Sequence, residues 1–136
     1  MKKGIIVVFG KSDMDVLENF YLKSFFNKQY KICLVNNGND NKILKFLFKL
    51  KESSKFDISI LNLRKEKTSM SAVKAGVRFL SKTEDINLIV HTSPKNIFNK
   101  TLMKKMRKIS AEDLVHKIDE RVLLRKVYDL KELING

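Results

Sequence analysis

Four short and mostly apolar runs, of which the first is continuous, constrain the fold of this chain most. They occupy residues 4–9, 31–35, 58–63 and 86–90, and longer amphipathic stretches separate them. A continuous run rich in β-branched residues is typical of a strand that is buried on both faces. Since each connection is long enough for a helix, the alternation predicts an α/β fold: a mostly parallel sheet with helices on both faces.

The stretches between these runs carry helical signals. Ser12 and Asp40 are expected to cap two helices, and residues 69–80 form a third with an apolar inner stripe. A basic helix is expected over residues 101–109, and Ser110 with Asp113 resembles a capping box for a further one.

The last segment permits two interpretations. Leu123, Val127, Leu130 and Ile134 have helical spacing. A strand over residues 121–127 followed by a short helix fits as well, and both alternatives stay open.

Length and composition favour one cytoplasmic domain. The chain has 136 residues, and a hydrophobic content of 43% is enough for a buried core. The first apolar run is too short for a signal peptide or a membrane span, so no transmembrane segment is expected. Cys33 is the single cysteine and is predicted to be a small buried residue in a strand.

The formal net charge of +13 favours anionic partners. A positive field of this size attracts nucleic acid, anionic lipid headgroups or anionic small molecules without selecting one of them. The chain shows no helix-turn-helix, zinc-binding or aromatic RNA-binding signature, so a nucleic-acid or anionic-membrane partner rests on charge alone.

The polar loops at the carboxyl ends of the predicted strands are the expected ligand site, because open parallel sheets bind ligands there. Arg64, Lys65 and Lys67 can meet phosphates, and Asn36 and Asn37 can pair with a base or a ribose. Lys11, Lys67 and Lys74 are placed to supply positive charge of the kind that a metal ion would provide. Gly38 allows close backbone approach. Neither a Gly-x-Gly-x-x-Gly motif nor a P-loop is present.

Three segments together resemble the family-two glycosyltransferases, which have the GT-A fold. Residues 34–40 read Leu-Val-Asn-Asn-Gly-Asn-Asp, residues 66–78 keep Ala72, Ala75 and Gly76, and residues 88–94 read Leu-Ile-Val-His-Thr-Ser-Pro. The resemblance implies the Rossmann-like nucleotide-binding half of that fold and a nucleotide-sugar donor. Residues 1–136 then form a single GT-A-like domain that lacks most of the acceptor-binding half.

The resemblance also implies a nucleotide site, whose residues are Gly10, Lys11, Asn36, Asn37, Gly38, Lys67, Lys74, Thr92 and Ser93. Two features depart from the family pattern. Asn36 stands where the family has a uracil-contacting Asp, and Thr92 and Pro94 replace both carboxylates of its metal-binding Asp-x-Asp. Thr and Pro cannot supply charged oxygen ligands, so no divalent metal is expected, and His91 alone does not make a metal site.

Whether the chain is an enzyme therefore stays open, and no catalytic residue is nominated. Three hypotheses follow. The chain is a glycosyltransferase-like protein that binds a nucleotide or nucleotide-sugar, with lysines in place of the metal. It is a catalytically silent GT-A-like module that acts through a protein partner or as a homo-oligomer. Or it is a basic protein that binds nucleic acid or an anionic membrane surface.

Overall fold

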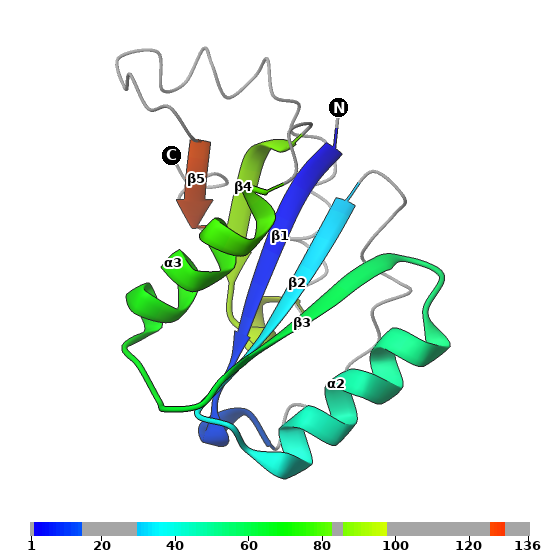
Figure 1. Cartoon of the computed structure of the whole chain (residues 1–136), viewed down its shortest axis with the longest axis vertical. Coiled ribbons are helices and arrows are strands. Elements are labelled where there is room, and N and C mark those ends of the chain that lie inside the picture. Colours follow the sequence, from blue (N-terminus) through cyan, green and yellow to red (C-terminus); the bar gives the residue numbers. More distant parts are fainter. Residues whose placement is uncertain (1, 15–29, 83–85, 98–125, 130–136) are drawn as a thin grey trace.

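A five-stranded, all-parallel sheet forms the centre of the computed structural model, which describes residues 2–14, 30–82, 86–97 and 126–129 (Figure 1). The strands are β1 (Lys2–Phe9), β2 (Tyr30–Asn37), β3 (Asp57–Leu63), β4 (Ile86–Thr92) and β5 (Lys126–Asp129). The helices are a 3-10 turn η1 (Lys11–Asp13), α2 (Asn41–Ser53), α3 (Ser69–Leu80) and α4 (Pro94–Ile97). The predicted α/β fold with a parallel sheet is confirmed.

The central strand β1 is buried on both faces. Its side chains alternate between the faces, so that Ile5, Val7 and Phe9 point to one side and Ile6 to the other. All four are at most 1% exposed. This explains why residues 4–9 of β1 are continuously apolar instead of alternating.

Helix α3 covers the face to which Ile6 belongs. Ala72 and Leu80 of α3 share a buried cluster with Ile6 and with Cys33 of β2. The helix can approach closely because Gly76 has no side chain: a Cβ there would lie 2.9 Å from Cγ2 of Ile6. The helix contacts β1, β2 and β4, and in Figure 1 one end of it is drawn in front of β4.

Helix α2 lies against β2 and β3 and covers the opposite face, where Ile43 and Leu47 are fully buried. The predicted cap is confirmed, since the Asp40 carboxylate accepts the N–H groups of Lys42 and Ile43 at 2.9 and 3.0 Å. Helices therefore pack on both faces of the sheet.

The strand order β3-β2-β1-β4-β5 contains one reversal of direction. The chain moves outward from β1 through β2 to β3, then crosses to the other side of β1 to form β4 and β5. The order therefore changes direction between β1 and β4, whose carboxyl ends lead into η1 and α4 respectively. Such a switch point leaves a crevice at the edge of the sheet.

The strand alternative for the last segment is the correct one, although β5 is shorter and later than the predicted 121–127. Its pairing with β4, Val127 opposite Ile89 and Asp129 opposite His91, is what selects strand over helix. Ser12 lies inside the short turn η1, where Asp13 accepts the N–H of Gly10, and the helix that Ser12 is expected to cap lies outside the described residues. The helices expected over 101–109 and from Ser110 lie outside the described residues.

Within the described ranges, the helices are too short or too polar for any of them to cross a membrane.

Cys33 provides a direct test of the core. Burial raises the pKa of its thiol from 9.0 to about 12, against a smaller opposing effect of the Lys31 charge. Because the thiolate is the reactive form, we expect iodoacetamide to modify the folded protein far more slowly at pH 8 than the protein in 6 M guanidinium. Mass spectrometry measures both rates, and equal rates would mean that β2 is not buried as described.

Candidate functional site

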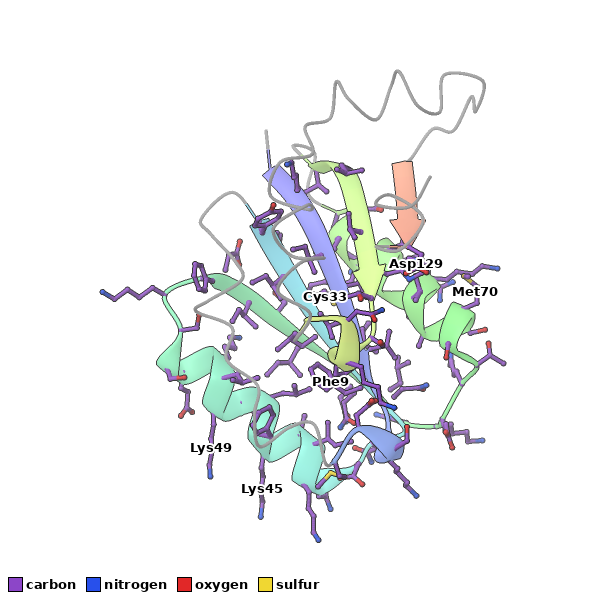
Figure 2. The ribbon with its side chains drawn as sticks, turned by 180° about the vertical axis from the view of Figure 1, so that it is seen from behind. Phe9, Cys33, Lys45, Lys49, Met70 and Asp129 are labelled. Atoms are coloured by element: carbon purple, nitrogen blue, oxygen red, sulfur yellow. The ribbon has the colours of Figure 1, made fainter. Side chains whose placement is uncertain are left out.

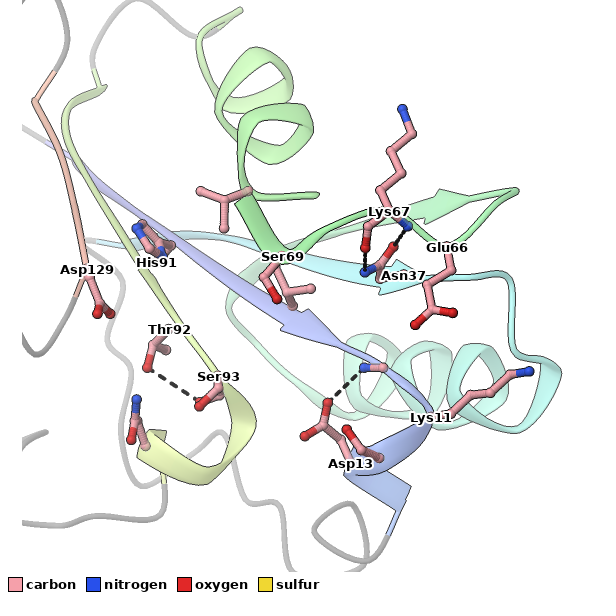
Figure 3. Close-up of a pocket in the computed structure, with 15 residues that line it drawn as sticks. Lys11, Asp13, Asn37, Glu66, Lys67, Ser69, His91, Thr92, Ser93 and Asp129 are labelled. Carbon is pink, nitrogen blue, oxygen red and sulfur yellow. Dashed lines mark hydrogen bonds between the residues drawn. The ribbon is translucent and has the colours of Figure 1, made fainter. Parts of the chain in front are cut away.

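A pocket of about 710 Å³ lies at the switch point between β1 and β4 (Figure 3). Ligand pockets in proteins typically have volumes of about 300–1,000 Å³. Every strand of the sheet contributes to its wall, directly or through the loop that follows the strand. The lining residues are Val8, Gly10, Lys11, Ser12 and Asp13 after or within β1, Asn37 of β2, Glu66, Lys67, Ser69 and Val73 after β3, His91, Thr92, Ser93 and Asn96 of β4 and α4, and Asp129 of β5.

The β1 side of the pocket is held by a tight turn. The N–H of Gly10 donates to Oδ2 of Asp13 at 2.8 Å, and the N–H of Asp13 donates back to the Gly10 carbonyl at 3.0 Å. This reciprocal pair fixes the Asp13 carboxylate at the floor of the pocket, while the neighbouring Lys11 side chain is exposed at its edge (Figure 3).

The wall on the β3 side is held by the side chain of Asn37. Its amide nitrogen donates to the Lys67 carbonyl at 2.8 Å, and its amide oxygen accepts the Lys67 N–H at 2.9 Å. The amide thus pairs with the loop backbone as a peptide group of a neighbouring strand would. Asn37 is only 9% exposed, so its primary role is to position Lys67 and the start of α3.

The start of α3 opens onto this pocket through Ser69. Thr68 caps the helix, since its hydroxyl oxygen accepts the N–H of Ser71 at 3.2 Å. Amide groups in the first turn of a helix favour negatively charged groups. In Figure 3 the Lys67 side chain extends outward from the rim, whereas the Glu66 carboxylate hangs below it.

The β4 side holds the segment that resembles the Asp-x-Asp motif. Thr92 ends the strand and is 7% exposed, Ser93 is exposed, and Pro94 begins α4. The Thr92 hydroxyl is 3.4 Å from the Ser93 carbonyl, which is a long hydrogen bond. Both Thr92 and Ser93 line the pocket, as do His91 of β4 and Asp129 beside it on β5.

The pocket differs in charge from the rest of the chain. It is lined by two lysines, Lys11 and Lys67, and by three carboxylates, Asp13, Glu66 and Asp129. With His91 neutral the lining has a formal charge of −1, in a chain of +13. Within the residues that the structure describes, no three His, Cys, Asp or Glu side chains gather so that they could hold a metal ion.

The structure brings six of the nine predicted site residues into this pocket: Gly10, Lys11, Asn37, Lys67, Thr92 and Ser93. Lys74 lies on the exposed side of α3 and is not in the lining. Gly38 is also outside it and has a structural role, because its φ of 114° is one that other residues rarely adopt.

Asn36 points to the opposite face of the sheet from Asn37 and is 0% exposed. Its amide nitrogen donates to the Asp40 carbonyl at 3.0 Å and to Oδ1 of Asn62 at 2.9 Å. The Asn62 amide in turn donates to Oδ1 of Asn39 at 2.7 Å. Asn36 therefore ties the ends of β2 and β3 to the start of α2.

Sequence reasoning did not nominate Asp13 or Asp129. Glu66 and Asn96 lie in loops that were expected to form the ligand site, residues 64–69 and 91–96, but neither was predicted as a site residue. Asp13 directly follows Ser12, the predicted cap, and so was expected in the first turn of a helix, where acidic residues are common. Asp129 lies in the segment that fitted either a helix or a strand. A signal for Asp129 was available: if the segment is a strand, Asp129 lies at its carboxyl end, where ligand-binding residues are expected.

The chain matches no protein-family model. Neither the curated proteins nor the solved structures contain a match to it. The resemblance to family-two glycosyltransferases therefore remains a prediction, and the function has to be argued from the pocket.

The orientation of the Asn36 amide leads to a stability prediction. Both of its near neighbours are acceptors, so the NH₂ group faces them, and within the described part of the chain Oδ1 is buried without a hydrogen-bond partner. Asn36→Asp would place a charged acceptor against the Asp40 carbonyl and Asn62. We expect it to lower the free energy of unfolding by about 1–3 kcal/mol or more in urea denaturation at pH 7.

Asn39→Asp is the matched control for this substitution. It leaves an acceptor for the Asn62 amide at an exposed position, so it should change the stability little. A stable Asn36→Asp variant would contradict the hydrogen bonds described for the Asn36 amide.

Proposed function

We propose that the switch-point pocket binds a nucleotide or a nucleotide-sugar, and that the chain is a glycosyltransferase-like protein. The observation that carries the proposal is the position of the pocket: all five strands contribute to it, at the point where the strand order reverses. Open α/β sheets bind their ligands at this point. The resemblance in residues 34–40, 66–78 and 88–94 supports the same ligand class.

The charges of the lining suggest how such a ligand would lie. Phosphate groups would face the start of α3 at Ser69, with Lys11 and Lys67 closing on them from the rim. The flexible stem of a lysine allows its ammonium group to swing toward a bound anion. Hydroxyl groups of a ribose or a sugar would donate to the carboxylates of Asp13 and Asp129.

Thr92 and Pro94 stand where the family carries its metal ligands, and in this proposal no step depends on a divalent ion. The two lysines supply the positive charge instead. The proposal covers binding and not sugar transfer. The lining contains carboxylates, but the hydrogen bond of Asp13 to the Gly10 N–H gives it a structural role and does not identify it as a general base.

Nucleotide binding is tested by thermal denaturation with millimolar UMP, UDP, ADP or UDP-glucose. We expect at least one of them to raise the melting temperature by several degrees, since a ligand at 100 times its dissociation constant adds about 2.7 kcal/mol of stability. The shift should be the same with manganese and with EDTA. If no nucleotide shifts the melting temperature, the proposal is wrong.

The site is tested by filling the pocket. Ser69→Phe places a bulky ring at an exposed position of the pocket wall and should weaken nucleotide affinity at least tenfold. Ser71→Phe is the matched control, because Ser71 is exposed in the same helical turn but is not part of the lining. Isothermal titration calorimetry measures the nucleotide affinity of both variants. Equal affinities would mean that the nucleotide binds outside this pocket.

A further inference from the structure

The outward side of α2 is the most concentrated basic surface of a single helix in the described part of the chain. Lys42, Lys45 and Lys49 are all exposed and recur at intervals of three and four residues, which places them on one side of the helix. Figure 2 shows Lys45 and Lys49 side by side, projecting away from the protein. At 1.5 Å per residue, the three lysines span about 10 Å along the helix axis.

An exposed aromatic ring lies beside these lysines. Phe48 is 47% exposed, and only Met70 joins it as an exposed large apolar side chain among the described residues. Phe48 follows Lys45 by three residues, so the two are neighbours on the helix surface. The core of the protein does not account for this position, because Ile43 and Leu47 already form the buried stripe of α2.

Few acidic groups oppose the lysines on this helix. Glu52 in the last turn is the only acidic residue within α2. The carboxylate of the capping residue, Asp40, is already engaged by the N–H groups of Lys42 and Ile43. Glu52 follows Lys49 by three residues, so one carboxylate lies beside three lysines, and the outward side of α2 keeps a net positive charge next to an aromatic side chain.

We propose that this surface, the α2 basic face (Lys42, Lys45, Phe48 and Lys49), binds single-stranded nucleic acid. Proteins that bind single strands without sequence preference combine cations that contact phosphates with an aromatic side chain on which a base stacks. A lipid surface fits less well, since a helix that lies in a membrane inserts an apolar face, and the apolar stripe of α2 is buried against the sheet.

The proposal is independent of the switch-point pocket. None of the residues of the α2 basic face belongs to the lining of that pocket. A nucleotide that raises the melting temperature therefore has no bearing on this surface, and the loss of one activity would leave the other intact.

The test is fluorescence anisotropy with labelled oligo(dT) and oligo(U) of 20 nucleotides at several salt concentrations. The variant Lys42→Gln/Lys45→Gln/Lys49→Gln should bind at least tenfold more weakly than the natural chain. Its plot of log affinity against log salt should be shallower by about 2, because each lost phosphate contact on a single strand removes about 0.7 from the slope. Circular dichroism checks that the variant is folded.

The matched control removes three cations from the opposite face of the sheet: Lys74→Gln/Arg78→Gln/Lys82→Gln. All three are exposed, on α3 and in the turn after it, so the control lowers the net charge by the same amount. It should keep most of the affinity. An equal loss in both variants would mean that net charge alone attracts the strand, and the proposal would be overturned.

Two further measurements separate this surface from other polyanion sites. Phe48→Ala should weaken oligonucleotide binding roughly fivefold or more, since a base that stacks on an aromatic side chain loses that contact. A Phe48→Ala variant with unchanged affinity would contradict the proposal. So would an α2 triple variant that loses binding to phosphatidylserine vesicles but keeps its affinity for the oligonucleotides.

Discussion

The need to cover the central strand on both faces determines the rest of this structure. β1 carries apolar side chains on each side, and either side left in water would cost several kcal/mol of hydrophobic stabilisation. A chain that kept adding parallel units in one direction, with right-handed crossovers, would place all its helices on one face. The crossing from β3 to β4 on the far side of β1 lets α3 cover the second face. The crevice between the ends of β1 and β4 is a direct result of that crossing, so the core and the pocket have the same cause.

Much of this fold could be predicted from the sequence, because continuous apolar runs and capped amphipathic stretches are strong local signals. The bounds of α3 follow from Thr68 and the stripe after it, and the parallel order follows from the alternation of elements. The fifth strand could not be predicted with the same certainty. The hydrophobic pattern of only four residues does not distinguish a strand from a helix. The segment is a strand because it pairs with β4.

The candidate site was less accessible to sequence reasoning than the fold. Asn36 and Asn37 were both predicted to bind a ligand. Neighbouring residues on a strand point to opposite faces of the sheet, so a pocket on one face can be lined by only one of the two. Two of the carboxylates in the lining were also missed. Asp13 and Asp129 lie more than a hundred positions apart, and only the sheet brings the segments that carry them to the same edge. The result is a pocket with a slightly negative lining inside a strongly basic chain.

The pairing between Asn37 and Lys67 divides the loop after β3 into two parts with different tolerance to change. Between Leu63 and Lys67 the chain is mostly exposed. It connects the end of β3 to the backbone of Lys67, which the Asn37 side chain holds in place, so the length of this part can vary without moving α3. The length from Lys67 to Ser69 cannot vary in the same way, because Lys67 is followed directly by Thr68, the capping residue of α3. In a lineage that carries this fold, insertions would accumulate on the first part, at the mouth of the pocket. Such insertions could reshape what enters the pocket while the sheet and its helices stay unchanged.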